Sequence, residues 1–294
     1  MKIIFIGAVR FSASALKATI ESGVEIVGVC TLADSKFNAD HEDLKPIAQK
    51  SCIPSLHVDD INCSETISWI REKKPDLIFC FGWSKLLGDE LLDLPPMGVI
   101  GCHPAALPRN RGRHPLVWTL ALGLKETSST FFFMDKGADS GDILSQAKVV
   151  VTKEDNASSL YGKISAVALE QIREFIPLLK NDSCHRMPQN HSQASYWRKR
   201  GLMDGQIDWR MPAKGIYNLI RALSEPYVGA HFIYRDKMIK VWDSVIVDLP
   251  EVQDIEAGKV LSKKEDGITI KCGEQCLTIK KFEPCEGLLV GDYL

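Results

Sequence analysis

The sequence predicts an α/β protein with a doubly wound, mostly parallel sheet, followed by a small C-terminal β-rich, barrel-like module. Over the first 180 residues, short and continuously apolar runs, typical of strands buried on both faces, alternate with amphipathic helical stretches. Strands that alternate with helices favour parallel pairing with right-handed crossovers. After residue 208 the pattern changes to short β-rich runs separated by Gly and Asp turns.

The first half supplies the elements of the parallel sheet. The buried strands are expected at residues 2–7, 24–31, 76–83 and 98–108, with a brief apolar run at 53–56. The helices are expected at residues 12–23, 43–52 and 64–74; Gly23 closes the first, and the third opens at Ser64 and ends before Pro75.

The second half contains one further helix and then the β-rich module. Residues 127–151 indicate two strands around a long loop, and apolar residues at helical spacing predict a helix over 155–180. Another helix is expected at 214–223, before β-rich runs at 231–242, 258–272 and 276–282. We therefore predict a catalytic domain over residues 1–182, a polar linker over 183–204 and the module over 205–294.

The charge balance argues against a large polyanion as the main partner. The 294 residues carry 36 Lys and Arg against 38 Asp and Glu, a net charge of −2. Residues 205–294 contain 12 basic and 14 acidic residues, so the module is not polybasic either. Because nucleic-acid binding depends on neutralising phosphates, nucleic acid is not the expected partner. A small phosphorylated ligand remains compatible with a local basic cluster.

Localisation is expected to be cytoplasmic. No apolar run approaches the roughly 18 residues of a membrane span, and the N-terminal run is short and lacks a cleavage site. The nine cysteines are an odd number and are scattered, which favours reduced thiols. Cys272 and Cys276 have no second pair beside them, so a zinc site is not expected.

Ligands of doubly wound sheets bind beyond the carboxyl ends of the strands, which singles out residues 7–12, 81–87 and 101–113. Arg10 and Ser12 in the first stretch are candidates for substrate binding. His103 follows a strand directly, where an imidazole suits proton transfer near neutral pH, although a structural histidine fits equally well.

Three arginines follow within five residues, Arg109, Arg111 and Arg113. Guanidinium groups at this spacing could clamp a phosphate in bidentate fashion; on composition alone a solvated loop is the simpler reading. We retain all three as candidate substrate-binding residues.

The acidic loop at 135–142 and the aromatic stretch at 81–87 are two further candidate sites. The loop does not have EF-hand spacing, so calcium is not expected; one of its carboxylates could orient a histidine, and a polar turn is the alternative. The aromatic stretch could wall a flat heterocycle, or Trp83 could belong to the core. The sequence has no GxGxxG, P-loop or GxSxG motif.

Together these stretches resemble the folate-dependent formyltransferase family, which includes methionyl-tRNA, glycinamide ribonucleotide and sugar N-formyltransferases. The family pattern is Asn-x-His, a Ser-Leu-Leu-Pro-like loop, Arg-Gly, and then Asp-x-Gly-x-Asp-[Thr/Ser]-Gly-Asp. The matching positions here are His103, residues 106–108, residues 111–112 and residues 135–142. Residues 189–194, 205–209, 220–223, Pro226 and 240–242 resemble the tail of the tRNA enzyme and of the module acting on UDP-4-amino-arabinose.

The resemblance implies formyl transfer from N10-formyltetrahydrofolate to an amine, without a metal. It places the proton acceptor on His103 and its carboxylate partner on Asp139. It places the pterin along the aromatic stretch and the acidic loop, with these candidate contacts: Phe81, Trp83, Ser84, Lys85, Leu86 and Asp135. One departure is Gly101, which stands where the family has the asparagine that helps hold the formyl oxygen; we expect another donor to substitute.

The acceptor expected from this comparison is a nucleotide-linked amino sugar, a UDP- or dTDP-4-amino-4,6-dideoxyhexose for a surface glycan. Residues 109–115 resemble sugar enzymes more than the tRNA enzyme, and residues 32–50 hold few cations (Lys36, Lys45 and Lys50). Two alternatives stay open: a methionyl-tRNA formyltransferase, and a non-catalytic folate or nucleotide-sugar binder suggested by Gly101. A homodimer is also left open.

Overall fold

The computed structural model describes residues 1–35 and 39–294; Lys36, one of the cations counted above, lies outside the described residues. The chain forms two compact units, and each contains segments from different parts of the sequence. The first unit comprises Met1–Gly112, Thr127–Val149 and Lys163–Trp197. The second comprises Arg113–Glu126, Val150–Gly162 and Arg198–Leu294, so it takes in two segments that precede the C-terminal module.

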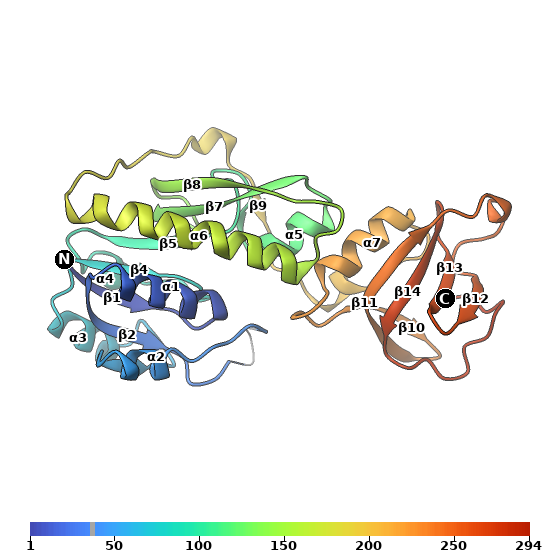
Figure 1. Cartoon of the computed structure of the whole chain (residues 1–294), viewed down its shortest axis with the longest axis horizontal. Coiled ribbons are helices and arrows are strands. Elements are labelled where there is room, and N and C mark those ends of the chain that lie inside the picture. The colour runs from blue at the N-terminus through green and yellow to red at the C-terminus, as the bar shows by residue number, and fades with distance from the viewer. Residues whose placement is uncertain (36–38) are drawn as a thin grey trace. The chain divides into compact units, whose positions relative to one another are not determined.

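A seven-stranded sheet forms the first unit (Figure 1), in the order β3-β2-β1-β4-β5-β7-β8. Neighbours from β3 to β5 pair in parallel, and β7 pairs antiparallel with β5. The predicted doubly wound, mostly parallel sheet is confirmed. Its strands are β1 (Lys2–Ile6), β2 (Glu25–Thr31), β3 (Ser55–His57), β4 (Leu77–Cys80), β5 (Val99–His103), β7 (Glu126–Phe133) and β8 (Ile143–Val150).

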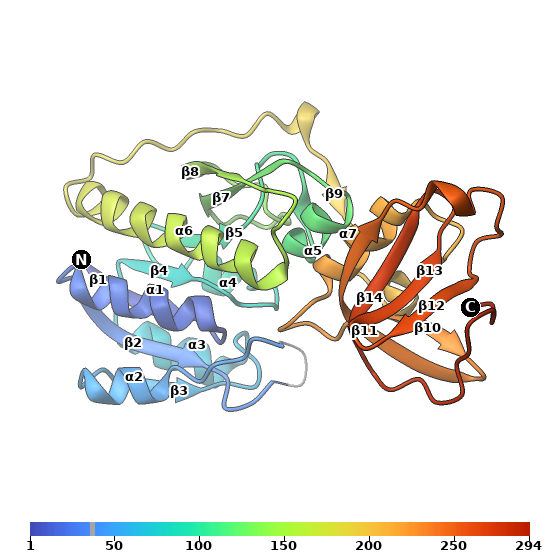
Figure 2. The same cartoon turned by 45° about the vertical axis from the view of Figure 1, so that its right-hand side comes forward.

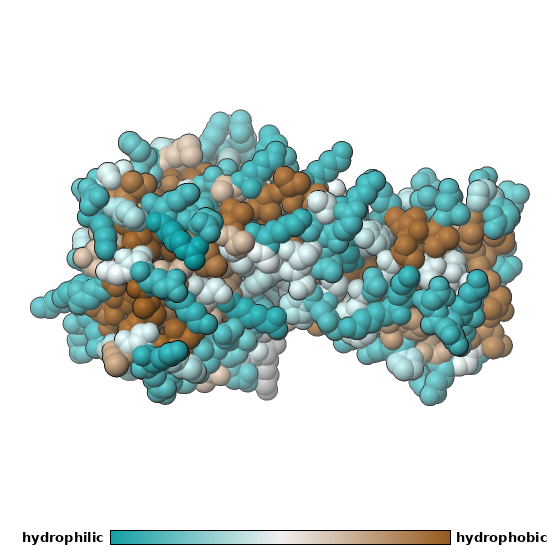
Figure 3. Space-filling view, in the orientation of Figure 1, coloured by the Kyte–Doolittle hydropathy of each residue, from teal (hydrophilic) through white to brown (hydrophobic). Residues whose placement is uncertain are grey.

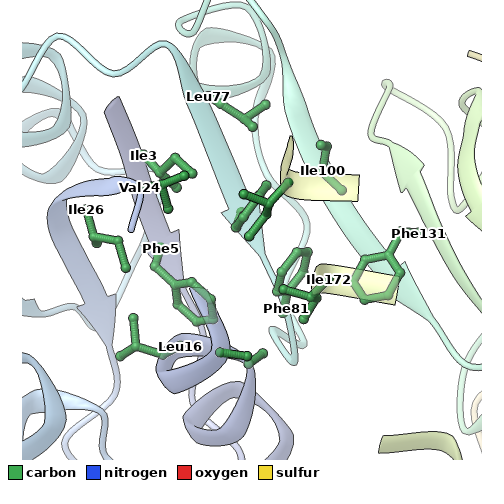
Figure 4. Packing of buried hydrophobic residues seen from close by; sticks show 14 of the residues in the cluster. Ile3, Phe5, Leu16, Val24, Ile26, Leu77, Phe81, Ile100, Phe131 and Ile172 are labelled. Carbon is green, nitrogen blue, oxygen red and sulfur yellow. The ribbon is translucent and has the colours of Figure 1, made fainter. Parts of the chain in front are cut away.

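Helices cover both faces of this sheet because successive residues of its central strands point to opposite sides. Ile3 and Phe5 of β1 pack in one apolar cluster with α1 and α6, whereas Ile4 and Ile6 pack in another with α3 and α4. Phe81 lies between Phe5 and Phe131 in the first cluster (Figure 4). The helices are α1 (Arg10–Glu21), α2 (Lys45–Lys50), α3 (Ser64–Glu72), α4 (Asp89–Leu92) and α6 (Ala157–Lys180).

The second unit is built on a five-stranded antiparallel sheet with the order β10-β11-β14-β13-β12 (Figure 2). Helix α7 (Ala213–Ala222) buries its apolar side in the same core, where Trp209 meets Phe232 edge to face. Helix α5 (Pro115–Ala121), which the sequence analysis did not predict, belongs to this unit. The strands are β10 (Ala230–Tyr234), β11 (Lys237–Val247), β12 (Val260–Lys264), β13 (Gly267–Lys271) and β14 (Cys276–Phe282).

The stretch predicted to be a linker is divided between the two units, with its residues up to Trp197 in the first unit and those from Arg198 in the second. Within it, β9 (Tyr196–Trp197) pairs in parallel with β6 (Arg111–Gly112). A 3₁₀ turn at His191–Gln193 precedes this pair, and a second at Leu202–Gly205 follows it. The segment before residue 198 therefore contributes to the surroundings of the Arg111 loop rather than acting only as a tether.

Hydrophobic surface lies in separate patches among hydrophilic side chains on the face shown in Figure 3. Within residues 1–35 and 39–294, none of the helices combines the length and apolar character required to span a bilayer.

Candidate active site

Strand β5 carries His103 to its carboxyl end, where the side chain is almost fully buried, at 5% exposure. The ring Nε2 lies 2.8 Å from the backbone carbonyl oxygen of Asn110. Because a carbonyl only accepts hydrogen bonds, Nε2 must carry the hydrogen in this contact. The neutral ring then keeps its lone pair on Nδ1, which is the nitrogen available to take up a proton.

The carboxylate of Asp139 faces that nitrogen, with Oδ2 3.5 Å from His103 Nδ1. The same oxygen accepts a hydrogen bond of 2.8 Å from the backbone N–H of Gly112. Asp139 has φ 54°, a left-handed conformation that Asp adopts more readily than most residues. The two residues named by the family resemblance thus come together across 36 positions of sequence (139 − 103).

Asp135 shapes the acidic loop from within. Its Oδ1 accepts hydrogen bonds from the Gly137 N–H at 3.0 Å and from the Ser140 hydroxyl at 2.6 Å. At Gly141, a Cβ atom would lie 1.8 Å from the Phe133 carbonyl oxygen, so only glycine fits there. Asp135 is exposed, and its predicted contact with the formyl donor stays a prediction.

The Phe81 ring is fully buried among core aromatic side chains, so only the backbone of this residue is left for the predicted contact with the pterin, which stays a prediction. Ser12 is also fully buried, and its hydroxyl donates a 2.5 Å hydrogen bond to the Phe81 carbonyl. Ser12 therefore ties the start of α1 to the end of β4 rather than facing a substrate. The Arg10 side chain, two residues earlier, is exposed.

The rest of the aromatic stretch remains at the surface of the first unit. Trp83 is half-buried, and the described residues offer its buried indole Nε1 no hydrogen-bond acceptor. Ser84 is half-buried, Leu86 is 76% exposed, and the Lys85 ammonium donates to the Asp59 carbonyl. Trp83 packs against the apolar cluster that contains Ile4 and Ile6, and its Nε1 is one of several buried polar atoms without a partner among the described residues.

The three arginines have different environments, and the proposed three-arginine clamp is wrong for Arg111. Arg111 is 1% exposed, and its guanidinium donates to Gln189 Oε1 at 2.6 and 3.2 Å, to the Tyr196 hydroxyl at 2.9 Å and to His191 Nδ1 at 3.2 Å. It is an internal structural cation. Arg109 is exposed and Arg113 is partly exposed.

Sequence reasoning named Arg113 but missed the other members of a cationic group in the second unit, here termed the Trp118 cluster: Arg113, His114, Trp118, Arg198, Lys199 and Arg200. The guanidinium of Arg200 lies 4.5 Å from the Trp118 ring centroid, and that of Arg198 lies 5.4 Å from it. Burial lowers the pKa of His114, and the positive charges of Arg113, Arg200 and Lys199 lower it further. The run Trp-Arg-Lys-Arg at 197–200 was the available signal.

No three His, Cys, Asp or Glu side chains gather as metal ligands would in the part of the chain that the structure describes. Each cysteine is a free thiol, and burial raises the pKa of Cys30, Cys80 and Cys102 to about 12.

Comparison with known proteins gives a family assignment. A family model described as formyl transferase matches residues 1–176, and one described as formyl transferase, C-terminal domain, matches residues 202–288. A methionyl-tRNA formyltransferase of Desulforamulus reducens is 33% identical over 289 residues, covering 96% of this chain and 90% of that protein. A methionyl-tRNA formyltransferase of Acetivibrio thermocellus is 29% identical, covering 100% and 96%.

A solved N-formyltransferase from Helicobacter canadensis, in complex with folinic acid and dTDP-3-aminofucose, has a similar fold. It is 16% identical, with a TM-score of 0.69 over 96% of this chain and 100% of that one. Matches over both halves of the sequence confirm the resemblance seen in its motifs. The chain therefore belongs to the formyl transferase family, whose members are enzymes that transfer formyl groups.

Proposed function

We propose that this enzyme transfers the formyl group of N10-formyltetrahydrofolate to the primary amine of a nucleotide-linked amino sugar, a UDP- or dTDP-4-amino-4,6-dideoxyhexose. The observation that carries the proposal is the distribution of charge. The C-terminal 90 residues (205–294) have a net charge of −2, from 12 basic and 14 acidic residues, whereas cations concentrate in the Trp118 cluster, in which Asp204 forms a salt bridge with Arg198. A compact cationic group next to an aromatic ring suits one nucleoside diphosphate better than an extended polyanion.

In the proposed reaction, the neutral amine of the sugar attacks the formyl carbon. A bond forms between the amine nitrogen and that carbon, and the bond between the carbon and N10 of the donor breaks. His103 accepts the proton that the amine loses, and the same proton is delivered to N10. Asp139 stabilises the imidazolium through the Nδ1 contact at 3.5 Å, which would tighten as the ring becomes charged.

The proposed donor site lies along Trp83–Leu86 and the acidic loop. Support comes from the unpartnered Nε1 of Trp83, which could donate to the polar edge of a pterin. Leu86 offers an exposed apolar side chain nearby in the sequence, as a flat heterocycle would require. Because the Phe81 ring is buried, its proposed contribution is reduced to the backbone.

The proposed contacts of the acceptor are cationic side chains. Arg113, Lys199 and Arg200 are candidates for holding the diphosphate, and Arg109 and Arg10 remain candidate contacts on exposed positions.

A methionyl-tRNA substrate is the second candidate, favoured by the 33% identity to the Desulforamulus reducens enzyme over almost the whole chain. The two candidates separate in one assay. The purified enzyme is supplied with N10-formyltetrahydrofolate and either a panel of UDP- and dTDP-amino sugars or Met-tRNA, and formamide products are identified by mass spectrometry. Formylation of tRNA with no reaction on any amino sugar would overturn the proposal.

The substitution Arg113→Gln should raise the KM for the nucleotide sugar about tenfold or more and leave the KM for the formyl donor unchanged. Loss of one charge-assisted hydrogen bond to a phosphate removes about 1.5–3 kcal/mol of binding free energy. Steady-state kinetics with each substrate varied in turn measures both constants. Arg210→Gln is the matched control, since Arg210 is exposed and pairs with Asp208 in the same unit. Equal KM changes in both variants would contradict the assignment.

Gly101 can be tested by restoring the asparagine of the family pattern. An added Cβ would lie 3.0 Å from Met134 Cγ and 3.1 Å from Phe132 Cζ, so we expect both Gly101→Ala and Gly101→Asn to cost about 1–2 kcal/mol of stability by crowding. The amide should make Gly101→Asn about tenfold faster than Gly101→Ala, because it adds a donor for the formyl oxygen. Equal turnover of the two variants would remove the case for a missing donor.

A further inference from the structure

The side-chain amide of Gln189 uses its full hydrogen-bonding capacity in the interior of the first unit. Its Nε2 donates to the backbone carbonyls of Asp139 at 2.9 Å and Gly141 at 2.6 Å. Its Oε1 accepts from the Arg111 guanidinium at 2.6 and 3.2 Å. Because carbonyls only accept and a guanidinium only donates, the amide has one possible orientation. Gln189 is 6% exposed, so water does not replace these bonds readily.

These bonds hold both sides of the hydrogen bond between the Gly112 N–H and the Asp139 carboxylate. On one side the amide fixes the main chain of Asp139 itself and of Gly141 two residues later. On the other it anchors Arg111, the residue immediately before Gly112, whose N–H binds the Asp139 carboxylate at 2.8 Å. One side chain thus sets the separation between the carboxylate and the N–H group that orients it.

Ser195, in the same segment, binds the residue whose carbonyl contacts His103. The Ser195 hydroxyl accepts a 2.9 Å hydrogen bond from the Asn110 N–H, and the Ser195 carbonyl accepts one of 2.9 Å from the Arg111 N–H. The Asn110 carbonyl in turn receives His103 Nε2 at 2.8 Å. Asn110 has φ 64°, a conformation in which such external support matters. The segment from Gln189 to Ser195 therefore contacts both the loop that carries Asp139 and the loop whose Asn110 carbonyl binds His103.

We propose that Gln189 is a positioning residue for formyl transfer: its amide couples the Arg111 loop to the acidic loop and so holds Asp139 at the distance from which it can charge-stabilise His103. The inference rests on the proposed roles of His103 and Asp139, but not on which amine is the acceptor. An error of about 1 Å in the placement of such a group can cost about 10²-fold in rate.

Two substitutions distinguish the role of the amide nitrogen from that of the amide oxygen. Gln189→Leu removes all four hydrogen bonds. Gln189→Glu keeps an acceptor for Arg111 but presents the carbonyls of Asp139 and Gly141 with an oxygen that has no hydrogen to donate. Gln193→Leu is the matched control, because it makes the same chemical change at an exposed position four residues further along.

We expect both Gln189 variants to lose about 10²-fold in kcat, with the KM for the formyl donor within about threefold of wild type. A merely structural role would not confine the loss to kcat, because partial loss of the fold would weaken binding of the formyl donor as well.

Thermal unfolding, monitored alongside, establishes that the assayed variants are folded. Rates within about threefold of wild type in either Gln189 variant, matching losses in Gln193→Leu, or a rise in the KM for the formyl donor as large as the loss in kcat would each overturn the inference. All rates are expressed relative to wild type on whichever acceptor wild type formylates, amino sugar or Met-tRNA. Failure of the amino-sugar proposal therefore appears in the wild-type enzyme, whereas failure of the Gln189 inference appears only in the ratios.

Discussion

The substitution His103→Ala should lower kcat about 10³-fold and leave the affinity for N10-formyltetrahydrofolate within about threefold. The imidazole is the proposed proton acceptor, and a positioned acid or base typically contributes 10²–10⁴-fold to the rate. The side chain is 6% exposed, and Nδ1, which faces Asp139, is the nitrogen that remains available to take up the proton. Turnover is measured by release of tetrahydrofolate, and donor affinity by titration.

The exposed His185 provides the control, since His185→Ala removes an imidazole from the same unit far from the Asp139 contact in sequence. Because His103 and Asp139 act together in the proposed mechanism, the double variant His103→Ala/Asp139→Ala should be scarcely slower than either single variant. Normal turnover of His103→Ala would eliminate the mechanism. Additive losses in the double variant would show that the two residues work independently.

The fold could be predicted because each strand and helix has a local signal in its own stretch of sequence. Continuous apolar runs identified the strands of the parallel sheet, whose residues are buried on both faces, as at Ile3–Ile6 of β1. The pairing of β6 with β9 could not be predicted in this way. Each strand has only two residues, and paired residues such as Arg111 and Tyr196 are 85 positions apart in the sequence. No local pattern therefore indicates the pairing.

Some residues of the candidate site could likewise be predicted, and others could not. The pair of His103 and Asp139 was expected from the family resemblance, and the structure places Asp139 Oδ2 3.5 Å from His103 Nδ1. The errors at Ser12 and Arg111 have one cause: polar residues were taken to face ligands, whereas here burial is compensated by protein acceptors, the Phe81 carbonyl and Gln189 respectively. Such compensation depends on contacts between distant segments, which residue type and spacing do not reveal.

Arg111→Met should destabilise the first unit by about 2 kcal/mol, and it should also slow formyl transfer. The substitution roughly conserves side-chain volume but leaves the buried Oε1 of Gln189 without a donor, a loss that costs about 1–3 kcal/mol. Tyr196 and His191 are exposed and can turn to water, so they add little. Urea denaturation gives the change in free energy of unfolding, with the exposed Arg109→Met expected within about 0.5 kcal/mol of wild type.

The double variant Arg111→Met/Gln189→Leu distinguishes a shared bond from two separate contributions. If the guanidinium and the amide stabilise the protein mainly through each other, removing the second partner also removes the unsatisfied acceptor left by the first. The double variant should then be more stable than the sum of the single losses predicts, by about 1 kcal/mol or more. Strict additivity would mean that Arg111 is held chiefly by Tyr196 and His191, and that the Asp139 loop gains its position without the buried guanidinium.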